Sequence, residues 1–103
     1  MQKISKNTYV ETGNRGSNNT LVVTKEGVVL IDTPQFPVDS VRLRDEIKKY
    51  GEVKYVINTE PHSDHFSGNC YFGGTVVGQE GQRKLIQSAS LEQLKQRIQQ
   101  MPK

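Results

Sequence analysis

The sequence predicts an α/β fold built from a β-hairpin, a strand–helix–strand unit and C-terminal helices. Apolar, β-branched runs over residues 20–24 and 28–32 predict two paired strands, because only a short loop with a glycine separates them. A third apolar run over residues 53–58 follows a segment with helical spacing, as in a strand–helix–strand unit. A length of 103 residues suits one domain with a modest core.

The first predicted strand lies near the N-terminus. It starts at Tyr9 and Val10 and ends near Gly13, and the turn-forming segment 14–19 follows it. In the run over residues 28–32, four consecutive apolar residues indicate burial on both faces of the sheet. This pattern predicts a sheet that is sandwiched between two layers.

A helix is predicted between the hairpin and the third apolar run. Asp39 or Ser40 can cap its N-terminus, and Gly51 can end it. Leu43 and Ile47 are four positions apart, so they share one helix face that can pack against the sheet.

Smaller elements are predicted after the third apolar run. A helical turn is expected over residues 66–69 and a short strand over 75–78. Residues 79–87 favour a helix that Gly81 weakens. Ser90 opens a capping box for a last helix, whose leucine, isoleucine and methionine residues recur at helical spacing and form one apolar stripe.

Composition and charge argue against several functional classes. Fourteen basic and eleven acidic residues give a net charge of +3 and are scattered, which is too weak a signal for nucleic-acid binding. No stretch approaches the roughly 18 apolar residues of a membrane span, and the N-terminus lacks the apolar core of a signal peptide. The single cysteine, Cys70, cannot form an intrachain disulfide, which fits a reducing compartment. We therefore expect a soluble, cytoplasmic protein that has no membrane partner.

The densest group of chemically active side chains comes directly after the third apolar run. Both histidines, His62 and His65, occur there, with Asp64 between them and Glu60 before them. Imidazole nitrogens and carboxylate oxygens are common ligands of divalent metals at hydrolytic sites. Pro61 keeps Glu60 extended, so the spacing predicts two ligand pairs for two adjacent metal ions. A surface loop with scattered polar residues is the alternative interpretation.

The pattern Glu60-x-His62-x-Asp64-His65 resembles the His-x-His-x-Asp-His signature of the metallo-β-lactamase superfamily, with glutamate in place of the first histidine. Residues 19–33 resemble the opening hairpin of that family, and the residues on either side of the signature also agree. The match extends over residues 8–87.

The resemblance implies a metallo-β-lactamase-like αβ/βα sandwich of half length, with residues 1–103 as the single N-terminal half of that domain. The implied function is metal-dependent hydrolysis of a small-molecule ester, lactone, thioester or amide through a metal-bound hydroxide. Family members take further ligands from their second half. We therefore expect a homo-oligomer or association with a missing second half. A non-catalytic half-domain that binds metal or assembles with a partner is the alternative.

The resemblance also implies roles for individual residues. Glu60 and His62 would hold one metal ion, and Asp64 and His65 the other. Asp64 would also act as the catalytic residue that orients the attacking water. Zinc is the expected ion, with iron or manganese as alternatives because a glutamate ligand makes the site harder. Asp32 is expected to hold the metal loop by hydrogen bonds or, alternatively, to form a turn at the strand end.

Overall fold

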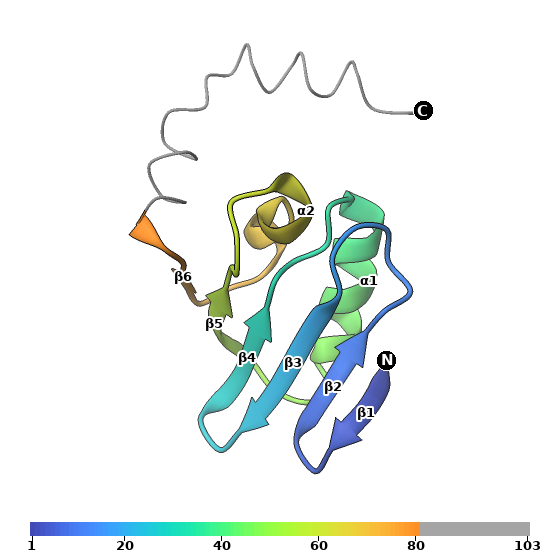
Figure 1. Ribbon diagram of the computed structural model, residues 1–103. Coiled ribbons are helices and arrows are strands. Elements are labelled where there is room, and N and C mark those ends of the chain that lie inside the picture. The colour runs from blue at the N-terminus through green and yellow to red at the C-terminus, as the bar shows by residue number, and fades with distance from the viewer. Residues whose placement is uncertain (81–103) are drawn as a thin grey trace.

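A computed structural model describes residues 1–80 as one mixed six-stranded β-sheet with helices beside it (Figure 1). The strands are β1 (Gln2–Ser5), β2 (Thr8–Glu11), β3 (Asn19–Thr24), β4 (Gly27–Ile31), β5 (Val53–Ile57) and β6 (Thr75–Val77). The helices are α1 (Pro37–Ile47), the single turn α2 (Ser63–Phe66) and the 3-10 turn η1 (Asn69–Tyr71). The α/β class predicted from the sequence is therefore confirmed.

The strands lie in the sheet in the order in which they occur in the sequence. Neighbours from β1 to β4 are antiparallel, whereas β4, β5 and β6 are parallel to one another. The helix α1 connects β4 to β5, which confirms the strand–helix–strand unit. In the β3–β4 hairpin, Thr24 pairs with Gly27, so the loop is one residue shorter than predicted. Gly27 has a φ of 137°, a conformation that favours glycine.

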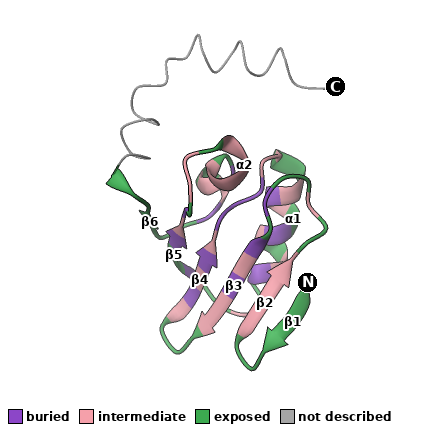
Figure 2. Cartoon of the chain, in the orientation of Figure 1, coloured by how far each residue is buried: buried purple, intermediate pink, exposed green. Residues whose placement is uncertain are grey.

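The hydrophobic core lies between α1 and one face of the sheet (Figure 2). Leu43 and Ile47 of α1 are buried in it, as their helical spacing predicts. The strands contribute the remaining buried aliphatic residues, which are Leu21, Val28, Leu30, Val53 and Val56. This packing fixes the positions of β4 and β5, whose C-terminal ends carry the candidate site.

The opposite face of the sheet is only partly covered by residues 1–80. Burial alternates along β4, where Val28 and Leu30 are fully buried but Val29 and Ile31 are not. Tyr55 of β5 pairs with Val29 and is 49% exposed. Burial on both faces of β4 was therefore a wrong prediction for this part of the chain, because α1 covers only one face. We call this partly apolar surface the open face and define it by Val22, Val29, Ile31, Tyr55 and Ile57.

Several element boundaries differ from the predicted ones. The strand β1 was not predicted, since its residues are exposed and carry no strong apolar pattern. The helix α1 begins at Pro37, before the predicted caps Asp39 and Ser40. Proline suits the first turn of a helix because the N–H group that it lacks would have no partner there. The helical turn expected over residues 66–69 begins earlier, as α2, and η1 follows it.

The predicted C-terminal helices fall mainly on residues that the structure does not describe. The helix predicted over residues 79–87 falls largely outside the described residues, and the last predicted helix, from Ser90, falls wholly outside them. Among residues 1–80, no helix has the length and apolar character needed to cross a membrane.

Replacing Leu30 by alanine tests whether the core between α1 and the sheet stabilises the fold. Because Leu30 is fully buried, the variant should lower the free energy of unfolding by about 2–5 kcal/mol through lost burial and a residual cavity. Urea unfolding followed by circular dichroism measures this change. Val38→Ala on α1 is the control, because Val38 is 65% exposed and surface substitutions usually change stability by less than about 0.5 kcal/mol. Equal losses in both variants would contradict this assignment of the core.

Candidate metal centre

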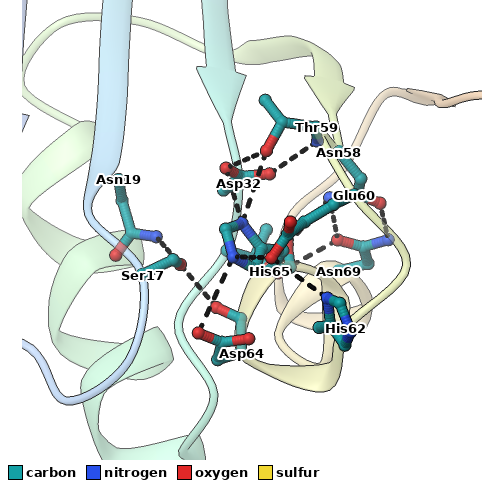
Figure 3. A network of polar contacts seen from close by, with 11 residues as sticks. Ser17, Asn19, Asp32, Asn58, Thr59, Glu60, His62, Asp64, His65 and Asn69 are labelled. Carbon is teal, nitrogen blue, oxygen red and sulfur yellow. Dashed lines mark hydrogen bonds and ion pairs between the residues drawn. The ribbon is translucent and has the colours of Figure 1, made fainter.

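Residues 59–65, which include the four predicted ligands and which we call the metal segment, lie beyond the C-terminal ends of the parallel strands β4 and β5. The chain leaves β5 after Ile57, crosses the end of β4 and turns through α2 and η1 (Figures 1 and 3). Ligand sites of sheets with parallel strands favour this position, where the strands end and loops begin. The fold therefore places the segment at the C-terminal ends of β4 and β5.

Three of the predicted ligands converge on one point. Glu60 Oε1 lies 2.6 Å from His65 Nε2, and Asp64 Oδ2 lies 3.7 Å from the same nitrogen (Figure 3). One donor atom from each of the three side chains lies within 4.8 Å of the others. Two carboxylate oxygens and one imidazole nitrogen form a donor set that suits divalent cations such as zinc, iron or manganese.

The fourth predicted ligand, His62, lies outside this cluster. Its side chain is 74% exposed, and its Nδ1 atom lies 3.2 Å from Glu60 Oε1. One oxygen of Glu60 therefore contacts both imidazole rings, and the residues do not separate into the two pairs expected from their spacing. That all four residues bind metal stays a prediction.

Asp32 connects the end of β4 to the metal segment. Its buried carboxylate accepts hydrogen bonds from the backbone N–H of Thr59 at 2.8 Å and from the Thr59 hydroxyl at 2.7 Å. His65 Nδ1 donates to the same carboxylate at 2.9 Å. These contacts confirm that Asp32 holds the metal segment by hydrogen bonds. Because Asp32 engages Nδ1, the Nε2 atom is the ring nitrogen that faces Glu60 and Asp64.

Asp32 also has an unusual backbone conformation. Its φ is 62°, in the left-handed region that aspartate and asparagine tolerate better than most residues other than glycine. The turn at this position directs the chain away from β4 while the carboxylate points toward the metal segment (Figure 3). Both interpretations of Asp32 made from the sequence, the loop anchor and the strand-end turn, therefore apply.

The negative charges around His65 change its protonation. Burial alone would lower the pKa of His65, but the hydrogen bond to Asp32 and the charges of Asp32, Asp64 and Glu60 outweigh it. The pKa of His65 is therefore raised above its ordinary value of 6.5. A protonated imidazole can donate to carboxylates through both nitrogens, whereas a metal ligand must have one nitrogen free of its proton.

Buried amide and hydroxyl groups hold the backbone of α2. Asn58 Nδ2 and the backbone N–H of Thr33 each donate to the carbonyl oxygen of His65, both at 2.9 Å. The side chains of Asn58 and Asn69 also bond each other, at 2.7 and 3.1 Å. The Ser17 hydroxyl donates to the carbonyl oxygen of Asp64. Segments far apart in the sequence thus fix the backbone of the two consecutive residues Asp64 and His65.

The interpretation of the sequence missed four of these positioning residues, which are Ser17, Thr33, Asn58 and Asn69. None is a histidine, cysteine or carboxylate residue, and their spacing in the sequence does not indicate a shared site. Asn58 has one usable signal, because a polar residue at the end of an apolar strand directly precedes the metal segment. The contact of Ser17 spans 47 positions, and only the folded chain reveals it.

Comparisons with known proteins agree with the fold. The family model of the metallo-beta-lactamase superfamily matches residues 12–75. A metallo-beta-lactamase from Pontibacter korlensis is 30% identical with a TM-score of 0.76, over 84% of this chain and 46% of that one. No curated protein matches the chain.

More distant structures share the fold. The DIM-1 metallo-beta-lactamase is 23% identical with a TM-score of 0.70, over 84% of this chain and 44% of its own. The metallo-beta-lactamase FIM-1 from Pseudomonas aeruginosa, in its mono-zinc form, is 16% identical with a TM-score of 0.64, over 81% of this chain and 42% of its own. The chain therefore spans a little under half the length of these proteins.

Replacing Asp32 by asparagine should lower the pKa of His65. The variant removes the charge and weakens the hydrogen bond that raise this pKa, and it keeps a residue that tolerates the positive φ. A pH titration of the His65 ring resonances by NMR measures the shift. Asp45→Asn on α1 is the control, because Asp45 is exposed and does not contribute to the shift of His65. A His65 pKa that is the same in Asp32→Asn and in the unsubstituted chain would contradict the proposed electrostatics.

Proposed function

The chain belongs to the metallo-β-lactamase superfamily, and on this premise we propose that its metal segment is part of a hydrolase centre. Glu60, Asp64 and His65 would bind a divalent metal ion, with the exposed His62 as a further ligand. The observation that carries the proposal is the convergence of three donor atoms within 4.8 Å at the position of the family signature. The proposed reaction is hydrolysis of a small ester, lactone, thioester or amide.

The donor set favours particular ions. Zinc is the first candidate because its ligands include imidazole and carboxylate groups and because a protein of the same fold, FIM-1, has a mono-zinc form. Iron and manganese are alternatives, since two carboxylates among three donors make the site harder. A divalent ion, when bound, supplies a Lewis acid that polarises a carbonyl group and lowers the pKa of water.

The side chains of this chain would then divide the remaining tasks. Asp64 would orient the attacking water and accept its proton, because its carboxylate lies at the cluster and is partly exposed. Asp32 would keep the His65 ring oriented with Nε2 toward the site, so that little reorganisation is needed during the reaction. Glu60 would add a negative charge beside His65 and Asp64, which offsets the charge of a divalent cation.

The centre would be completed by a second layer on the open face. The chain covers 46% of the Pontibacter korlensis protein, and its metal segment offers at most four ligands. The open face carries apolar residues in three adjacent strands, and contiguous exposed apolar surface marks interaction sites. We propose that a second copy of the chain or a second half-domain covers this face. The exposed position of His62 favours the competing proposal, a non-catalytic half-domain that binds metal without turnover.

Zinc titration and hydrolase assays test the proposed centre directly. The unsubstituted chain should bind zinc in isothermal titration calorimetry, and His65→Ala should abolish binding, because it removes the only nitrogen donor of the three-residue cluster. Zinc-dependent hydrolysis of an ester, lactone, thioester or amide should disappear in the same variant. Ser67→Ala is the control, since Ser67 is exposed at the end of α2. Equal zinc affinity in His65→Ala would refute the site, whereas zinc binding without turnover would favour the non-catalytic alternative.

A charge on the open face tests the proposed association. The unsubstituted chain should form oligomers in native mass spectrometry, and Tyr55→Lys should shift it toward monomer, because a buried ammonium group at the contact would be desolvated. Val38→Lys is the matched control, since Val38 is also an exposed apolar residue but lies on α1. A monomeric unsubstituted chain would assign the open face to a second half-domain instead of another copy.

A further inference from the structure

We infer that the loop between β2 and β3, residues 12–18, positions Asp64 for the proposed metal centre through Ser17 and Gly16. This inference rests on the proposed function, because that proposal assigns Asp64 to the metal ion and to the attacking water. The Ser17 hydroxyl donates a hydrogen bond to the backbone carbonyl oxygen of Asp64 (Figure 3). The loop therefore contacts the backbone that carries one of the proposed donors.

The hydroxyl of Ser17 is itself held in place. Ser17 is buried, and Asn19, which is almost fully buried, directs its Nδ2 atom to Ser17 Oγ at 3.5 Å. Asn14 Nδ2 in turn donates to Asn19 Oδ1 at 3.1 Å. Asn19 is the first residue of β3, so the series of contacts runs from the sheet through Ser17 to Asp64. A rigid element thereby supports the contact.

Gly16 brings the backbone of the loop directly against Asp64. A Cβ atom at Gly16 would lie 2.8 Å from the Cβ atom of Asp64, which is closer than real Cβ contacts. Gly16 also has a φ of 91°, a conformation that residues with a side chain rarely adopt. Glycine is therefore required at this position both by its conformation and by the closeness of Asp64.

Hydrogen bonds from other segments already hold His65, the residue that follows Asp64. The ring of His65 is held by Asp32, and its carbonyl oxygen is held by Asn58 and Thr33. The contact from Ser17 adds an anchor one residue earlier, at Asp64. Metal sites need their donors held within about 0.5 Å of the productive geometry. Ser17 is thus a positioning residue, because it would act on the proposed donor through the backbone of Asp64 and would not itself be a ligand.

Variants of the loop test this inference in the 103-residue chain, with zinc calorimetry and the absorption spectrum of bound Co²⁺ as the measurements. Ser17→Ala should weaken zinc binding about tenfold, the effect typical of losing an outer-shell contact, and should alter the Co²⁺ spectrum. Ser17→Thr keeps the hydroxyl and should restore most of the affinity. Gly16→Ala should weaken binding by displacing Asp64. Asn18→Ala is the control, because Asn18 is an exposed residue of the same loop.

The outcomes separate this inference from the proposed function. Unchanged zinc affinity in folded Ser17→Ala and Gly16→Ala would overturn the inference and leave the metal centre standing. An unsubstituted chain that binds neither zinc nor Co²⁺ would overturn the proposed function and the inference with it. If neither variant folds, as judged by circular dichroism, the loop serves the fold and not the site, and the inference is also overturned. Weakened binding that Ser17→Thr restores would support it.

Discussion

The metal segment depends on the buried carboxylate of Asp32. A buried carboxylate is costly unless hydrogen bonds and positive charge compensate for its lost hydration. Here Thr59 donates twice and His65 once, so the partners come from the segment that the carboxylate must hold. The end of β4 and the metal segment therefore stabilise each other. The same contacts select the ring nitrogen of His65 that faces the cluster, which links the packing of the strand end to the chemistry of the site.

Local patterns in the sequence were sufficient to predict the strands and the long helix that support the site, but not the bounds of α2. The apolar runs predicted the β3–β4 hairpin and β5, and the spacing of Leu43 and Ile47 predicted the buried face of α1. The histidines and carboxylates of the metal segment were identified because they are close in sequence. Local patterns could not predict that Glu60 contacts both histidines or that Ser17 reaches Asp64, because these contacts depend on rotamers and on distant segments.

The prediction that β4 is buried on both faces was wrong for residues 1–80, and the reason lies in what an apolar run indicates. Val29 and Ile31 are apolar residues suited to burial. An apolar run does not indicate which element packs over them. Within residues 1–80, α1 covers the sheet face that carries Val28 and Leu30, and these are the only buried residues of β4. The pattern therefore reports how apolar the residues on both sheet faces are, but it does not show that an element of residues 1–80 covers the second face.

The order of the strands has a consequence for how the chain folds. Neighbouring strands from β1 to β4 pair through short connections, so this part of the sheet needs little loop closure. The contacts that assemble the metal segment span 27 positions between Asp32 and Thr59 and 47 between Ser17 and Asp64. Distant contacts form late, because their entropic cost is met only when other structure is in place. We therefore expect the metal segment to be the last part of the described residues to become ordered. A bound ion would then stabilise the state in which this segment is ordered.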